Sequence, residues 1–124
     1  MSHPVLVVDD ERDLRVTYER LLRRQGYQVI QADSRHEGLA RIRAHPLSLV
    51  IADLRLADGD GLDVVAAARS AAVPAAAIVV TASPSPESRR ASVAAGASGF
   101  LVKPFAAADL SAIVRQVLGG ERRL

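Results

Sequence analysis

The stretch Val5-Leu6-Val7-Val8-Asp9-Asp10 places four consecutive apolar residues directly before two aspartates. An uninterrupted apolar run of this kind is typical of a strand that is buried on both faces, as in a parallel sheet covered by helices. The following apolar residues, from Leu14 to Leu22, fall on one face of a helix, and Gly26 provides a stop signal. The sequence therefore predicts a strand followed by a helix, with two carboxylates at the carboxyl end of the strand.

The same alternation of a short apolar run and a helical pattern recurs four more times. The further strands are predicted at 28–32, 47–52, 76–80 and 99–102. Five strand–helix units in succession predict one parallel sheet with helices on both faces, an α/β fold.

Local signals predict where several of the helices begin and end. Ser34 can cap the second helix, with Glu37 reaching back to complete a capping box. Ser85 and Pro86 have the residue types of an N-cap and a first helical position. Gly119-Gly120 is predicted to terminate the last helix.

The length and composition predict one globular domain over residues 1–124, with 119–124 as a tail or the start of a linker. A hydrophobic fraction of 49% with 24% charged residues excludes a disordered chain, and the absence of cysteine excludes disulfides. No apolar run approaches the roughly 18 residues that a membrane span requires. The N-terminus also lacks the pattern of a signal peptide. We therefore expect a cytoplasmic protein with no membrane partner.

The charge balance argues against direct nucleic-acid binding. The sequence pI is about 9.7, but the net charge is only +2 at pH 7. The pI is high because few groups titrate between about pH 7 and 10. Lys103 is the only lysine in a chain whose other 15 basic residues are arginines. Because ammonium and guanidinium groups are not interchangeable, this exception points to a specific role for Lys103.

Polar residues follow four of the five predicted strands, where ligands bind in open parallel sheets. They are Asp9 and Asp10 after the first strand, Asp53 after the third, Thr81 after the fourth and Lys103 after the fifth. Three carboxylates at one edge repel one another and imply a divalent cation. Oxygen ligands without cysteine or histidine favour Mg²⁺. Together with a hydroxyl and an ammonium group, this set provides what phosphoryl transfer to a carboxylate requires.

Four segments of the chain resemble the receiver domain of two-component response regulators. They are VLVVDDE (5–11), VIADLRLADGDGLD (50–63), VVTAS (79–83) and GFLVKPF (99–105). The resemblance covers essentially the whole chain and implies a flavodoxin-like, CheY-like fold with strand order 2-1-3-4-5.

The resemblance also implies roles for individual residues. Asp53 would be the phosphoacceptor, which attacks a phosphohistidine and becomes an aspartyl phosphate. Asp10, Asp53 and the backbone carbonyl of Arg55 would hold Mg²⁺, and Asp9 would contribute mostly through water. Lys103 would pair with Asp53 before phosphorylation and with a phosphate oxygen afterwards.

A switch and a set of partners follow from the same resemblance. Thr81 would move inward onto the phosphoryl group, and Phe100 stands at the aromatic switch position of the family. The output surface would be formed by the fourth helix, the fifth strand and the fifth helix. The implied partners are a sensor histidine kinase or phosphotransfer protein, an output partner or effector domain of unknown identity and, as a candidate on phosphorylation, a second copy of the chain. Self-catalysed phosphotransfer and autodephosphorylation are expected.

The sequence departs from the usual family pattern at three places. Ala57 stands where proline is common, which predicts a slightly looser loop after Asp53. Phe100 lacks the hydroxyl of the commoner tyrosine. The loop Ser83-Pro84-Ser85-Pro86 is predicted to be stiff and to restrict the movement that couples Thr81 to the next helix.

Three other functions fit the sequence less well. A haloacid dehalogenase-type phosphatase, kept as the alternative, also uses an aspartate nucleophile with Mg²⁺, but its nucleophile follows the first strand and its acidic pair comes late. A dinucleotide-binding fold needs a glycine-rich turn where Asp9-Asp10-Glu11 stands. Asp58-Gly59-Asp60-Gly61 lacks the spacing of a calcium loop, because Leu62 and Asp63 occupy positions that need other residue types.

Overall fold

The computed structural model describes residues 3–122 and contains a main sheet of five parallel strands in the order β2-β1-β3-β6-β7. These strands are β1 (Val5–Val8), β2 (Val29–Ala32), β3 (Leu49–Asp53), β6 (Ala76–Thr81) and β7 (Gly99–Val102). Because β6 and β7 are the fourth and fifth main strands, the predicted order 2-1-3-4-5 and the flavodoxin-like fold are confirmed.

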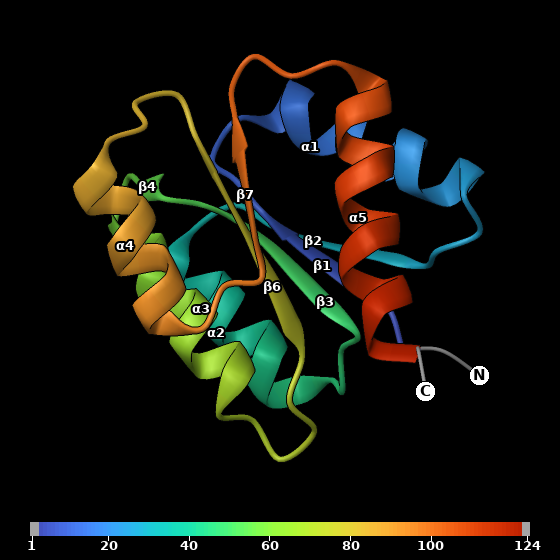
Figure 1. Cartoon of the computed structure of the whole chain (residues 1–124). Helices are drawn as coiled ribbons and strands as arrows, with labels where there is room; N and C mark the ends of the chain where they lie inside the picture. Colours follow the sequence, from blue (N-terminus) through green and yellow to red (C-terminus); the bar gives the residue numbers. More distant parts are fainter. Residues whose placement is uncertain (1–2, 123–124) are drawn as a thin grey trace.

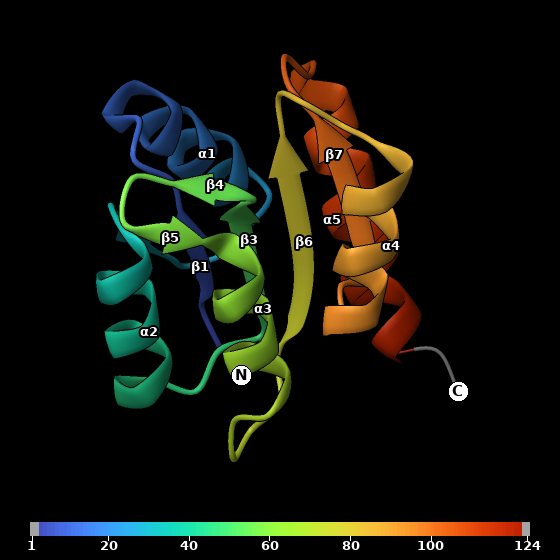
Figure 2. The ribbon, with the colours of Figure 1, turned by 90° about the vertical axis from the view of Figure 1, so that its left-hand side faces the viewer.

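Five helices cover the two faces of this sheet (Figure 1). They are α1 (Arg12–Arg24), α2 (Arg35–Ala44), α3 (Gly61–Arg69), α4 (Pro86–Ala95) and α5 (Ala107–Arg122). Helices α1 and α5 pack on one face, whereas α2, α3 and α4 lie on the other, as the rotated view in Figure 2 also shows. In the described part of the chain, no helix combines the length and apolar character needed to cross a bilayer.

The core consists of two apolar layers, one on each side of the sheet. Val5 and Val7 of β1 face the layer beneath α1 and α5, whereas Leu6 and Val8 face the layer beneath α2 and α3. Alternate residues of a strand point to opposite faces, so a strand buried on both sides must be apolar throughout. All four side chains are essentially inaccessible, and each contributes about 1.5–3 kcal/mol through burial.

The last helix continues beyond its predicted end. Gly119 and Gly120 were predicted to terminate it, but α5 runs through both glycines to Arg122. Glycine disfavours a helix interior by about 1 kcal/mol relative to alanine but does not block its hydrogen bonds. Val114 and Leu118, which are buried against the sheet, anchor the preceding turns. Of the predicted tail 119–124, residues 123–124 lie outside the described part of the chain.

The start of α2 follows the prediction with one change. The Ser34 hydroxyl accepts the Glu37 N–H at 3.0 Å, as an N-cap does. The Glu37 carboxylate, however, accepts the N–H of Asp33 at 2.7 Å rather than that of Ser34, so the predicted capping box is shifted by one residue. The predicted start of α4 is confirmed, with Ser85 as the N-cap and Pro86 at its first position.

A small antiparallel hairpin that the sequence did not predict follows β3. It consists of β4 (Arg55–Leu56) and β5 (Gly59–Asp60), with Ala57 and Asp58 at its tip. Gly61 then begins α3 so close to β3 that a Cβ at this position would overlap the backbone carbonyl of Asp53. The path from β3 to α3 therefore requires glycine at position 61.

Candidate functional site

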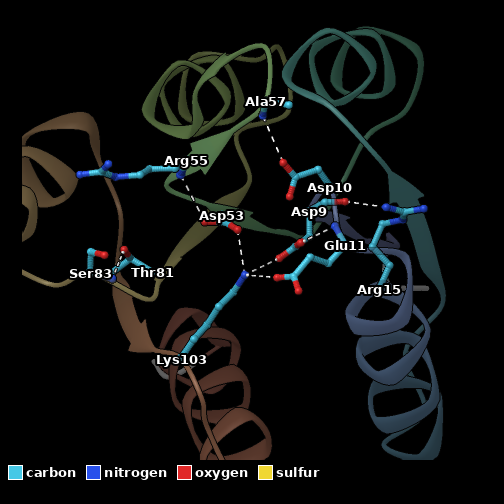
Figure 3. Close-up of polar contacts among 10 residues, drawn as sticks. All are labelled: Asp9, Asp10, Glu11, Arg15, Asp53, Arg55, Ala57, Thr81, Ser83 and Lys103. Atoms are coloured by element: carbon cyan, nitrogen blue, oxygen red, sulfur yellow. Dashed lines mark hydrogen bonds and ion pairs between the residues drawn. The ribbon is translucent and has the colours of Figure 1, made fainter.

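Residues at the carboxyl ends of β1, β3 and β7 converge at one edge of the sheet (Figure 3). Parallel pairing aligns Val8 with Ala52, so Asp9 and Asp53 leave neighbouring strands at the same level. The Lys103 N–H donates to the Thr81 carbonyl at 2.8 Å, which aligns the end of β7 with that of β6. The predicted meeting of Asp9, Asp53 and Lys103 at the carboxyl edge is therefore found in the structure.

Three carboxylates form an acidic cluster at this edge. Asp9, Asp10 and Asp53 each present an oxygen, and these oxygens lie within 4.8 Å of one another. Asp9 is buried, Asp53 is partly buried and Asp10 is exposed. A donor set of carboxylate oxygens open to solvent on one side fits a hard divalent cation that keeps part of its water shell.

Lys103, which directly follows β7, forms ion pairs with carboxylates of the site. Its Nζ lies 2.8 Å from Asp53 Oδ2, 3.0 Å from Asp9 Oδ2 and 3.3 Å from Glu11 Oε1. Burial disfavours the charged ammonium group, but hydrogen bonds and charge attraction from Asp53 and Asp9 outweigh it, so the pKa of Lys103 lies above its ordinary value. One ammonium group thus balances three carboxylates that come from two different segments of the chain.

Asp9 is the most buried member of the cluster, with 1% of its surface exposed. Burial raises its pKa above the ordinary value, although the Glu11 N–H and Lys103 oppose this shift. The Glu11 N–H donates to Asp9 Oδ1 at 2.8 Å, and the Arg15 guanidinium group donates to the Asp9 backbone carbonyl at 2.7 Å. These contacts fix the Asp9 carboxylate at the base of the cluster.

Glu11 contributes a contact to the site that no sequence pattern predicted. It is largely exposed, and its side chain reaches back across the start of α1 to Lys103. The acidic residue after the aspartate pair was visible in the sequence, but nothing there indicated the direction of its side chain.

The segment that follows β3 donates two backbone N–H groups to carboxylates of the cluster. Asp10 Oδ2 accepts the N–H of Ala57 at 3.2 Å, and Asp53 Oδ1 accepts the N–H of Arg55 at the same distance. Ala57 therefore holds a carboxylate of the cluster through an N–H that the commoner proline does not have. The side chain of Arg55 is exposed and extends away from the cluster in Figure 3.

Thr81 and Phe100 lie outside the acidic cluster. Thr81 is buried at the end of β6, and its hydroxyl accepts the N–H of Ser83 at 3.0 Å (Figure 3). Phe100 is half-buried in β7, and the guanidinium carbon of Arg89 stands 4.4 Å from its ring centroid. This stacking joins α4 to β7, and no sequence pattern predicted it.

Comparisons with known proteins agree with the fold and the site. The model of the response regulator receiver domain matches residues 5–115. The transcriptional regulatory protein PrrA of Mycobacterium tuberculosis is 36% identical over 117 residues, which are 94% of this chain and 50% of that protein. The chain thus spans about half the length of the curated relatives it matches.

Two solved structures superimpose on nearly the whole chain. A CheY-like receiver domain protein from Methanospirillum hungatei has a TM-score of 0.91 at 28% identity, covering 98% of this chain and 97% of that one. A response regulator from Burkholderia pseudomallei, solved with a phosphorylated aspartic acid, a calcium ion and citrate, has a TM-score of 0.83 at 28% identity, covering 98% and 74%. The cluster of Asp9, Asp10 and Asp53 matches the phosphoacceptor site of such proteins. The chain belongs to the family of response regulator receiver domains.

Proposed function

We propose that the chain accepts a phosphoryl group on Asp53 from a histidine kinase or a phosphotransfer protein in the cytoplasm. One observation carries this assignment: the Asp53 carboxylate lies 2.8 Å from Lys103 Nζ and within the acidic cluster. The phosphorylated aspartic acid of the Burkholderia pseudomallei response regulator supports the same chemistry.

The chain's own residues provide a site for Mg²⁺ beside the acceptor. Asp10, Asp53 and the backbone carbonyl of Arg55 would hold the ion, and Asp9 would contribute mostly through water. When bound, the ion neutralises negative charge on the carboxylates and on the incoming phosphoryl oxygens.

The transfer step is a displacement at phosphorus. A carboxylate oxygen of Asp53 forms a bond to the phosphorus atom, and the bond from phosphorus to the histidine nitrogen breaks, leaving the electron pair on the imidazole. Lys103 moves from the carboxylate to a phosphoryl oxygen, where its charge stabilises the product. The product is an acyl phosphate. Attack of water on its phosphorus would break the bond from phosphorus to the carboxylate oxygen, which releases inorganic phosphate and regenerates the Asp53 carboxylate. We expect the chain itself to promote both reactions, with the Asp53 carboxylate as the nucleophile of the first.

The phosphoryl group would then change the equilibrium between two conformations. The Thr81 hydroxyl would leave the Ser83 N–H and donate to a phosphoryl oxygen, and the ring of Phe100 would follow. These movements would alter the face formed by α4, β7 and α5, which we propose as the surface for an effector domain, an output protein or a second copy of the chain.

Phosphorylation by a small acyl phosphate tests this function directly. In the presence of Mg²⁺ and acetyl phosphate, intact-mass measurement should show one added phosphoryl group on the wild type and none on Asp53→Asn. Asp13→Asn, which changes an exposed carboxylate on the first turn of α1, serves as the matched control and should be labelled like the wild type. Equal labelling of Asp53→Asn would refute the assignment.

A further inference from the structure

The tip of the β4–β5 hairpin is bonded to the start of α2. Asp58 Oδ1 accepts the N–H of Arg35 at 2.8 Å, and Asp58 Oδ2 accepts the N–H of His36 at 2.9 Å. These two N–H groups belong to the first two residues of the helix, which have no partner within it. A residue from the segment after β3 therefore caps a helix that begins 23 residues earlier.

The capping of α2 is divided between a distant and a local residue. Asp58 accepts the first two N–H groups, and the Ser34 hydroxyl accepts the third, from Glu37. The hydrogen bonds from His36 and Arg35 hold the pKa of Asp58 below its ordinary value. The negative charge also lies at the positive end of the helix dipole.

A second set of contacts joins the same two segments. The Arg35 side chain crosses the hairpin at Gly59, where a Cβ would come within 2.6 Å of Arg35 Cδ. Beyond the hairpin, Arg35 Nε pairs with Asp63 Oδ2 at 2.8 Å, on the first turn of α3. Three contacts thus join the hairpin and the start of α3 to α2: the packing of Arg35 on Gly59, the hydrogen bonds that Asp58 accepts, and the ion pair of Arg35 with Asp63.

Other residues of the same hairpin contact the acidic cluster. Ala57, which precedes Asp58, donates its N–H to Asp10 Oδ2. On the same hairpin, Arg55 pairs with Asp60 and donates its N–H to Asp53 Oδ1. A displacement of the tip would therefore move donors that contact two of the three clustered carboxylates.

We propose that Asp58 is a positioning residue for the metal and phosphoryl site, because it fixes the hairpin on α2 and so sets the Ala57 N–H against Asp10. This proposal rests on the proposed function of the cluster. It assigns α2 a role in organising a site that its own side chains do not enter.

Two alanine substitutions at the start of α2 distinguish an effect on the metal site from a general loss of protein stability. Asp58→Ala removes the distant cap, whereas Ser34→Ala removes the local cap and leaves the hairpin attached. Both should lower the stability of the protein. Only Asp58→Ala should weaken Mg²⁺ binding to the unphosphorylated protein, as measured by isothermal titration calorimetry. The expected loss is on the order of three- to tenfold, at or below the low end of the range for outer-shell partners of metal ligands.

A measurement without metal provides the second readout. In the metal-free protein, the amide of Ala57 should exchange faster with solvent in Asp58→Ala than in Ser34→Ala.

The outcomes distinguish this proposal from the proposed function. Mg²⁺ affinity that is unchanged in Asp58→Ala, or equally reduced in Ser34→Ala, would overturn the positioning role. Failure of the wild type to bind Mg²⁺ at all would instead contradict the proposed function of the cluster.

Discussion

At the scale of single residues, the site is an electrostatic balance between Lys103 and the surrounding carboxylates. A compact ammonium group can approach oxygens of Asp53, Asp9 and Glu11 from one atom, as the three distances of 2.8–3.3 Å show. A planar guanidinium group presents its donors in a rigid fork and fits this geometry poorly. This difference gives a physical reason for the only lysine in an arginine-rich chain.

Asp9 should make the metal-free protein less stable as the pH rises. Its pKa in the folded state lies above the ordinary value of 3.8, so between these values the folded state binds more protons than the unfolded state. Its contribution to stability is therefore lost as the pH rises through this window. We expect the stability of Asp9→Asn relative to the wild type to increase from below pH 3.8 to neutral pH.

Urea unfolding of both proteins over this pH range, without divalent ions, measures the effect. The same substitution should weaken stabilisation by Mg²⁺, which follows the affinity of the site. A stability difference that does not change with pH would show that burial does not disfavour the charged form of Asp9.

The sequence predicted which residues meet at the site because their places at strand ends determine their approximate positions. Asp9, Asp53 and Lys103 needed only the topology to converge. The contacts of Glu11 and Asp58 depend on side-chain directions and on the path of a loop, neither of which follows from hydrophobic periodicity. They could not have been derived from the pattern of the chain.

At the scale of elements, the turn from β3 into α3 brings the acceptor strand and a helix into close contact. The Gly61 N–H donates to the Leu54 carbonyl at 2.8 Å, and the position leaves no space for a side chain over Asp53. The backbone of the proposed acceptor is therefore held in place by the start of α3.

Gly61→Ala should destabilise the protein and displace the site. Forcing a methyl group against the Asp53 carbonyl should cost about 1–3 kcal/mol or more, as overpacking does. Gly119→Ala is the matched control, because nothing lies within 4 Å of a Cβ there, and it should be neutral or stabilising by up to about 1 kcal/mol. Thermal unfolding measures both, and equal effects would contradict the close approach at Gly61.

The stacking of Arg89 on Phe100 should hold α4 against β7. Arg89→Ala should lower stability by about 0.5–1 kcal/mol, the usual contribution of an exposed cation–π pair. It should also accelerate amide exchange in α4 and shift the ring resonances of Phe100. Arg90→Ala, which changes the next exposed residue of the helix, should leave those resonances in place, and similar shifts in both variants would argue against the contact.

Element boundaries were predictable where one residue type determines them. Ser85 and Pro86 begin α4 as expected, because capping depends on local chemistry. The predicted end of α5 was wrong, because the burial of residues in the preceding turns outweighed the weak helix propensity of Gly119 and Gly120. The β4–β5 hairpin was missed because two-residue strands are too short for a detectable alternation.

At the scale of the whole molecule, the fold brings distant parts of the chain to one edge. The cluster combines residues from the ends of β1, β3 and β7, which are separated by as many as 94 positions in the sequence. Helix α2 reaches the same region through Asp58, and α4 is linked to β7 through Arg89 and Phe100. Both links lie on the face of the sheet that α2, α3 and α4 cover.

Locating the phosphoryl group on the chain decides whether Asp53 becomes an aspartyl phosphate. After phosphorylation with Mg²⁺ and acetyl phosphate, borohydride reduction converts an aspartyl phosphate to homoserine, which peptide mass mapping can locate. We predict homoserine at position 53 alone, and none without Mg²⁺. Conversion at another aspartate, or a stable phosphate on Thr81 or Ser83, would show that Asp53 is not the acceptor.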